Sequence, residues 1–363
     1  MSMLEMSPDA LSVVQGSHSI YIRAESWLDG ELLAAEIPIN SGGEERDRSA
    51  AIPESVRLNV PRRDRGVSWE PIEPDHPLGA FGQQLRIDYG VDMGGHIEWI
   101  NRGWFLITSS ETDGDTVAVQ AEGLLTLIDE AKFVGPFQPA LGDTLASVSR
   151  ALVEPALTIA FDGSLVDRPV PQGMQWDTDR LGALREVLGA WPADCRVTED
   201  GFLAIEPLVD TGPPVLSLTD GVGGTVMRWQ GGASRDGAFT VVVAQGEDAD
   251  GGQIQGVAYD DDETSPFRAG GPFSPLPVPH YHQSPLLTTV AQCRTAAATT
   301  LRRLRRSASR KLGVSMVPHP GLMTGDVVSA TGAGLTSQPC MIEALSLPYT
   351  PSEMHLTVRV LNG

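Results

Sequence analysis

Residues 315–330 read SMVPHPGLMTGDVVSA, and this stretch decides how the end of the chain folds. Its first residues are typical of a strand, and the Pro-His-Pro-Gly run at 318–321 interrupts that strand. Gly325 and Asp326 then open a second apolar strand. Immediately before the stretch lies the longest helical pattern in the chain. The C-terminal region therefore predicts a long helix, followed by strands that are joined through a Pro-Gly connection.

The long helix is predicted over 285–312. Ser284 can cap it, and Pro285 suits the first turn because its missing N–H has no helical partner there. Gly313 follows as the expected stop. Apolar residues recur at three- and four-residue steps, namely Leu287, Val290, Ala297, Leu301, Leu304 and Ala308.

The first part of the chain predicts a small antiparallel β-barrel or sandwich, placed at 1–138. A hairpin turn is expected at Asp29-Gly30, and residues 83–122 alternate like a meander with Gly- and Asp-rich turns. Residues 40–51, NSGGEERDRSAA, are interpreted as a polar loop.

The sequence pattern changes from strand-like to helix-like in the middle of the chain, and we place a small α+β insert at 139–215. Residues 142–153 and 177–190 predict amphipathic helices that begin at Asp143 and at Asp177-Thr178. A hairpin turn is expected at 199–201.

A second β-barrel domain is placed at 216–363. It is interrupted by residues 246–284, interpreted as a long loop or extended arm, and by the helix at 285–312. The fold class is therefore α+β and mostly β, with two small antiparallel β-barrel domains, a small α+β insert and one long helix.

The composition of the chain disfavours several classes of function. The 363 residues carry 47 acidic and 26 basic side chains, a net charge of -21, which disfavours nucleic-acid binding. The three scattered cysteines support neither a disulfide framework nor a zinc site. The N-terminal MSMLEMSPDA does not resemble a signal peptide, and no stretch approaches a membrane span, so we expect folding in a cytoplasm.

Catalytic motifs do not emerge from the sequence: there is no G-x-S-x-G, no HExxH and no GxxxxGK[ST]. We therefore predict a protein that is not an enzyme and needs no cofactor. His280 and His282, near the acidic run 260–263, have a metal-like composition, but a mobile polar loop is the favoured interpretation and no metal site is predicted.

The closing stretch resembles the final domain of phage tail hub proteins, and it is similar to that of the type VI secretion spike proteins related to them. The resemblance rests on a "P-x-L-x-x-G-D-x-V" pattern, carried here by Pro318, Pro320, Leu322, Gly325, Asp326 and Val328.

A second resemblance lies in the first β region. The segments 85–90, 99–107 and 117–125 look like actinobacterial siphophage minor tail proteins, although Gly123 stands where that family usually has Asp. The insert helix and hairpin also fit. The resemblance implies a structural hub at the tail tip of the virion, assembled in the host bacterial cytoplasm. It implies a homotrimer whose barrels form a pseudo-six-fold collar that closes the tail tube, with a channel through which DNA passes without specific binding. The implied neighbours are the distal tail protein ring, the tape measure protein and the tip or fibre proteins.

The basic segment, as we call residues 302–311, is the candidate site. It concentrates six cations in ten residues of an acidic protein. Three interpretations are open: a solvated helix end favoured by the helix dipole, pairing with acidic residues of a neighbouring subunit, or nucleic-acid contact. We predict that the segment lies at a subunit interface. The residues are Arg302, Arg303, Arg305, Arg306, Arg310 and Lys311.

Two other functions remain open on the sequence. A tail-associated cell-wall hydrolase predicts one essential acidic pair and needs no ring. A receptor-binding tail protein predicts exposed aromatic residues and glycan binding by the isolated chain.

Overall fold

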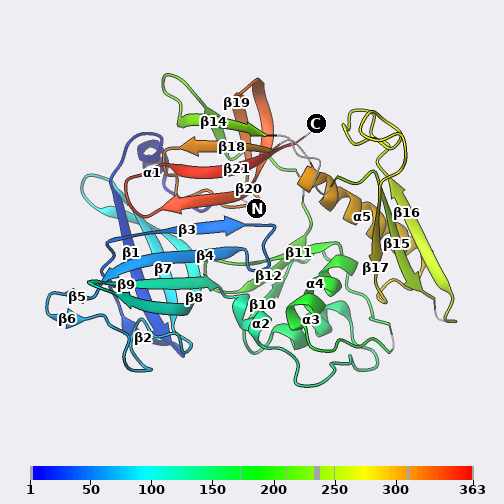
Figure 1. The fold of residues 1–363 in the computed structure, drawn as a ribbon, viewed down its shortest axis with the longest axis horizontal. Helices are drawn as coiled ribbons and strands as arrows, with labels where there is room; N and C mark the ends of the chain where they lie inside the picture. The colour runs from blue at the N-terminus through cyan, green and yellow to red at the C-terminus, as the bar shows by residue number, and fades with distance from the viewer. Residues whose placement is uncertain are drawn as a thin grey trace.

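The computed structural model describes residues 3–171, 173–209, 211–232, 238–248, 250–308 and 311–361, with the backbone alone at 306–308. The first β region and the β15–β17 sheet lie toward opposite ends of the molecule, and the insert lies below the last β region (Figure 1).

The first β region consists of antiparallel strands, and the three strands within residues 84–123 form a meander. A short helix, α1 (Pro8–Val14), precedes it; the Ser7 side chain caps this helix and donates to Glu98 Oε2 at 2.5 Å. Along β4 the buried and less buried residues alternate, as a strand with one face on a core requires. The strands are β1 (Ile20–Leu28), β2 (Glu31–Ala34), β3 (Ser41–Asp47), β4 (Glu54–Pro61), β5 (Arg63–Asp64), β6 (Val67–Ser68), β7 (Gln84–Asp92), β8 (Ile97–Asp113) and β9 (Thr116–Gly123).

The expected polar loop at 40–51 is wrong in its first part, because Ser41–Asp47 form strand β3. Glu44 and Arg46 are buried on the inner face of this strand. Their charge hides the alternation that would otherwise mark a strand, since the inward positions are ionic rather than apolar.

The insert follows the predicted order of helices and hairpin. Thr144 caps its first long helix and accepts from the Ser147 amide, and Asp179 caps the second and accepts from the Gly182 amide. Each cap lies one or two residues after the expected one. Asp143 instead accepts from the Ser147 hydroxyl at 3.0 Å. The elements are α2 (Thr126–Glu130), α3 (Leu145–Val153), β10 (Ile159–Phe161), α4 (Arg180–Ala190), β11 (Ala193–Val197) and β12 (Leu203–Pro207).

The last β region joins the first one through hydrogen-bonded strands. Strand β20 pairs with β3, which places Ser346 opposite Glu45 and Ala344 opposite Asp47. The described strands of the two regions thereby form a 13-stranded sheet in the order β14-β18-β21-β20-β3-β4-β9-β8-β7-β1-β2, with β13 and β19 alongside. The C-terminal strands are β13 (Leu216–Thr219), β14 (Val226–Gly232), β18 (Lys311–Met316), β19 (Val327–Gly332), β20 (Leu335–Pro348) and β21 (Met354–Val360).

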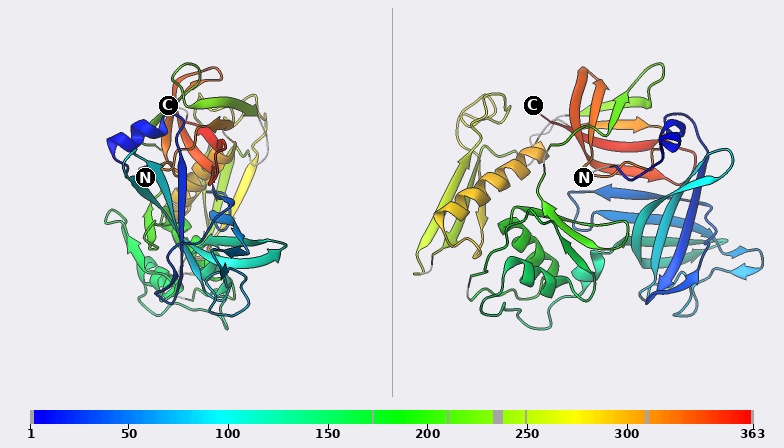
Figure 2. Two further views of the ribbon diagram at one scale, coloured as in Figure 1. Left: turned by 90° about the vertical axis from the view of Figure 1, so that its left-hand side faces the viewer. Right: turned by 180° about the vertical axis from the view of Figure 1, so that it is seen from behind.

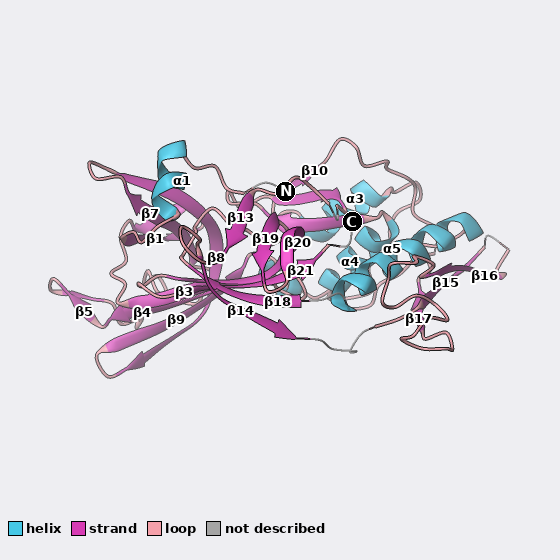
Figure 3. Ribbon diagram, turned by 90° about the horizontal axis from the view of Figure 1, so that it is seen from above, coloured by secondary structure: helices cyan, strands magenta, loops and turns pink. Residues whose placement is uncertain are grey.

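The mostly β, α+β class is confirmed, but the two expected barrels do not close within the described residues. The pairing of β3 with β20 occupies an edge of the first region, and in the last region the described strands β13 and β14 are not paired with each other, so one open sheet runs through both regions. Figure 3, seen from above, shows that this sheet is strongly bent, with β1 and β7 lying apart from β3, β4 and β9. Buried apolar residues of both regions also belong to one cluster, from Ala10 to Val360. The division at 1–138, 139–215 and 216–363 stays a prediction.

The expected long loop at 246–284 is wrong, because two strands lie within it. They flank β15 (Val241–Glu247) and are β16 (Gln253–Tyr259) and β17 (Pro279–Gln283). The residues of these strands, QIQGVAY and PHYHQ, do not alternate regularly between apolar and polar, so the periodicity that predicts a strand is weak. The helix α5 covers one face of this sheet, which is visible from behind in Figure 2.

The long helix is shorter than predicted. It spans α5 (Val290–Ala308), and Thr289 accepts from the Gln292 amide at its start. Ser284 accepts from the Leu286 amide in the preceding connection, where Leu286 and Leu287 are buried without being helical. At the other end, Lys311 was expected in the helix and Gly313 as the residue that ends it, but both belong to strand β18. Within the described residues, no helix is long and apolar enough to cross a membrane.

Candidate functional site

The loop that decides the C-terminal fold is held by an arginine from the first β region. Residues 317–326 connect β18 to β19, as the sequence predicts for the Pro-His-Pro-Gly stretch. Arg102 of β8 donates to the carbonyl of Pro320 and to that of Leu322, the second at 3.2 Å. Leu4 donates its amide to Gly321 at 2.9 Å from the other side. The loop is therefore tied both to the meander and to the N-terminal segment.

Arg102 belongs to a buried ionic network that we call the arginine cluster: Glu44, Arg46 and Arg102. Both arginines bond to Glu44, and the Arg102 Nη2 to Glu44 Oε1 distance is 2.8 Å. Burial alone would raise the pKa of Glu44, but the charges and hydrogen bonds of the two arginines hold it at about 2. The carboxylate is therefore ionised at neutral pH, and its charge is compensated inside the protein.

The structure gives a local reason for glycine at position 123, where the resemblance in the sequence leads one to expect Asp. A Cβ atom built on Gly123 would lie 2.4 Å from Oε2 of Glu54, which is closer than real Cβ contacts. The Glu54 carboxylate, 3.8 Å from Arg46, thus occupies the space that a side chain at 123 would need. Burial raises the pKa of Glu54, and the nearby Arg46 opposes that shift.

Two titratable groups of the closing loop are buried with incomplete hydrogen bonding. Neither ring nitrogen of His319 has a hydrogen-bond partner among the described residues, and burial lowers its pKa to about 4. Asp326 accepts from the Met323 amide at 2.9 Å, while its other oxygen has no described partner. Burial raises the pKa of Asp326 to about 6.

The basic segment is divided by the structure. Arg303 donates to the carbonyl of Ala193 in the insert at 2.9 Å, and Arg305 donates to Asp262 at 2.9 Å. Arg305 also lies 3.3 Å from the buried Asp260. Both arginines therefore bind α5 to other segments of the same chain.

The other members of the basic segment have different positions. Arg302 is exposed on α5, where its guanidinium lies 3.4 Å from Thr299, and Lys311 is exposed at the start of β18. The side chain of Arg306 and all of Arg310 lie outside the described residues. The structure does not test the subunit-interface role predicted for the segment.

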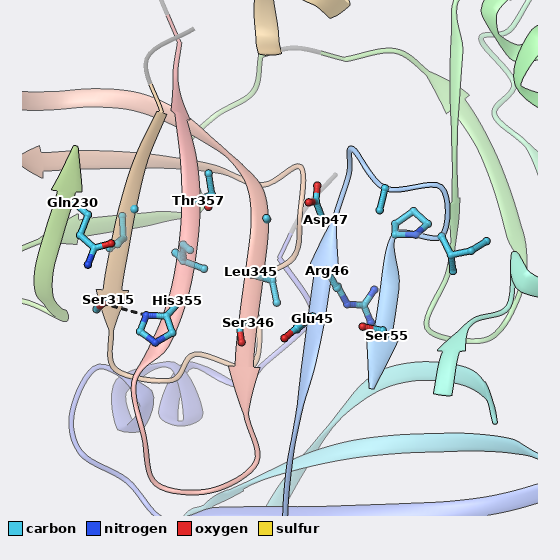
Figure 4. Close-up of a pocket in the computed structure, with 17 residues that line it drawn as sticks. Glu45, Arg46, Asp47, Ser55, Gln230, Ser315, Leu345, Ser346, His355 and Thr357 are labelled. Atoms are coloured by element: carbon cyan, nitrogen blue, oxygen red, sulfur yellow. Dashed lines mark hydrogen bonds between the residues drawn. The ribbon is translucent and has the colours of Figure 1, made fainter. Parts of the chain in front are cut away.

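A groove missed by the sequence analysis crosses the outer face of the sheet, at the junction of β3 and β20. Its volume is about 450 Å³. Cross-strand neighbours form a polar row along its floor, and Figure 4 shows the imidazole of this row bonded to the nearest hydroxyl. The row runs Ser315, His355, Ser346, Glu45 and Ser55, each opposite the next on adjacent strands.

Two exposed carboxylates line the groove. Glu45 and Asp47 are alternate residues of β3 and point to the same face. The groove's arginine, Arg46, is turned to the opposite face and bound to Glu44. No local motif could reveal this groove, because residues about 300 positions apart in the chain form its floor through the β3–β20 pairing.

His280 and His282 lie on strand β17, so the mobile loop expected there is wrong. The His280 ring packs against Phe239 with their centroids 5.0 Å apart. Burial lowers the pKa of His282, and His280 and Arg303 add to that shift. Within the described part of the chain, no group of three or more potential metal ligands is found.

The sequence matches no protein-family model and no curated protein. Solved structures do match the fold. The tail protein from Neisseria meningitidis MC58 is similar with a TM-score of 0.63 and 13% identity, over 94% of this chain and 97% of that one. The 43 kDa tail protein of prophage MuSo2 from Shewanella oneidensis is similar with a TM-score of 0.57 and 14% identity, over 93% and 98%.

A third similar structure comes from a secretion system. It is an E. coli component of the type VI secretion system, described as structurally similar to T4 bacteriophage tail proteins, with a TM-score of 0.52 and 12% identity over 95% of this chain and 77% of that one. The chain therefore has the fold of phage tail proteins and of a type VI secretion component, as the resemblance in the sequence suggested.

Proposed function

We propose that the protein is a structural component of a phage tail: the hub at the tail tip, acting as a homotrimer rather than as an enzyme. The observation that carries the proposal is the fold, shared over nearly the whole length with two phage tail proteins. The match extends over nearly the whole of both chains, so it is not confined to one small domain.

The sheet topology supports a ring. The 13-stranded sheet spans both β regions, and its edge strands among the described residues are β14, β13 and β2. Unpaired sheet edges favour pairing with a neighbour, and contacts between different surfaces of identical chains form a ring when the rotation between neighbours closes. Three copies, each contributing its two β regions, would give the pseudo-six-fold collar.

The charge supports a role around DNA without affinity for it. A net charge of -21 repels the phosphate backbone, so DNA can pass a channel in the collar without being held. In this account the collar closes the tail tube and connects distal tail protein to the tip or fibre proteins, and Arg302 and Lys311 contact the neighbouring subunit.

The test is the mass of the purified chain by light scattering, for wild type and for the R302E/K311E variant. The proposal expects a trimer for wild type and a weaker trimer for the variant, because both cations are exposed and their reversal leaves the intrachain bonds of Arg303 and Arg305 in place. An unchanged trimer in the variant would remove these two residues from the interface.

A further inference from the structure

The groove at the β3–β20 junction has the size and lining of a binding site. Its volume of about 450 Å³ lies within the range of ligand clefts, roughly 300–1,000 Å³. The floor is built from regular strands, so its shape is set by the sheet itself. Hydroxyl and imidazole groups of Ser55, Ser315, Ser346 and His355 supply donors and acceptors across it.

The charge of the groove selects the ligand chemistry. Its exposed ionisable groups on β3, Glu45 and Asp47, are carboxylates, while Arg46 is neutralised on the other face by Glu44. Alternate residues of a strand lie about 7 Å apart on one face. Cations at positions i and i+2 of an extended segment have the same spacing and also share a face, so such a segment can reach both carboxylates.

We propose that this groove binds an extended, basic segment of another protein, with Lys or Arg side chains at alternate positions that pair with Glu45 and Asp47. A second copy of this chain is the weaker choice of occupant. Its cation-dense stretch is the basic segment, and two arginines of that segment already bind Ala193, Asp260 and Asp262 within the chain. The inference goes beyond the proposed hub function and does not require a trimer.

Peptide binding tests the inference on the full-length chain. The probe is Ac-Gly-Lys-Ser-Lys-Gly-NH2, titrated by isothermal calorimetry at low salt. We expect binding that weakens at least tenfold in the E45Q/D47N variant. Asn at position 47 retains an oxygen that can accept from Ser49, so the turn there is preserved. If the double variant does not fold, E45Q alone replaces it.

Two controls separate the groove from general attraction to an acidic protein. D113N/D115N removes an exposed carboxylate pair that is also two residues apart in sequence, at the β8–β9 turn, and it should leave binding unchanged. The peptide Ac-Gly-Lys-Lys-Ser-Gly-NH2 should bind more weakly, because adjacent residues of an extended chain point to opposite faces.

Three outcomes overturn the inference: no binding to wild type, equal losses in the two double variants, or no preference for alternate lysines. Light scattering on the same samples distinguishes the two proposals. A trimer that persists while the peptide fails to bind rejects the groove and not the hub.

Discussion

Arg102 and Glu44 form a fully buried bidentate ion pair, with Nε–Oε2 at 3.0 Å and Nη2–Oε1 at 2.8 Å. The same guanidinium holds the carbonyls of Pro320 and Leu322. One side chain of the meander therefore fixes the closing loop more than 200 residues away in the chain. This contact, together with the β3–β20 pairing, unites the two β regions.

Replacing Glu44 by Ala should be strongly destabilising. Arg102 and Arg46 would be left buried without their shared carboxylate, and breaking a buried pair typically costs about 3–5 kcal/mol. Urea unfolding should show this loss in the free energy of unfolding. E45A, which removes the exposed neighbour on the same strand, is the matched control and should change stability by less than about 0.5 kcal/mol. Similar losses for the two variants would mean that the network does not stabilise the fold.

Asp326 should make stability depend on pH. Its pKa is about 6 in the folded protein, above the ordinary 3.8, so the folded state holds this proton more tightly than the unfolded chain. Its contribution to stability is present below pH 4 and is lost as the pH rises through 6. D326N cannot ionise, so its free energy of unfolding should exceed that of wild type by up to about 3 kcal/mol at pH 7 and much less at pH 4.

Chemical unfolding of wild type and D326N at several pH values between 4 and 7 provides the measurement. D113N, at an exposed turn, serves as the control. A difference between D326N and wild type that stays constant across this range would contradict the assignment.

Gly123→Asp should restore the residue of the resembling proteins and yet destabilise this one. The new side chain would overlap the Glu54 carboxylate, and overpacking of this kind costs about 1–3 kcal/mol. In an E54A background the same substitution should cost less, because the overlapping atoms are gone. Thermal or urea unfolding of the four proteins measures this coupling. Equal costs in both backgrounds would show that Glu54 is not the obstacle.

Arg305 should stabilise the packing of α5 against its sheet. R305A leaves the buried Asp260 without this cation, and we expect a loss of about 1–3 kcal/mol together with faster hydrogen exchange in β16. R302A removes an exposed arginine of the same helix and should leave that exchange rate unchanged. If both variants behave alike, the ion pairs of Arg305 do not anchor the helix.

Local patterns predicted the fold well wherever a segment carries its own signal. The Pro-His-Pro-Gly connection, the insert helices and the β11–β12 hairpin are recognisable from turn residues and apolar spacing. Strand β3 was missed because Glu44 and Arg46, its inward residues, are charged, and their partner Arg102 is distant in sequence. The expectation of two separate barrels was wrong partly for the same reason, since the pairing of β3 with β20 could not be inferred without β3.

The site was less predictable than the fold. The basic segment is obvious in the sequence, but whether an arginine is exposed or bound to its own chain depends on where Ala193 and Asp260 come to lie. The groove depends on cross-strand neighbours alone. Single residues such as Ser315 and His355 carry no signal until the strands are paired.

The central claim is the ring, and image averages of the purified chain by electron microscopy test it most directly. We predict particles of three chains, each of 38.7 kDa, with a central hole and six similar densities around it. Particles that contain one chain at all concentrations, or a closed assembly without three-fold symmetry, would contradict the account.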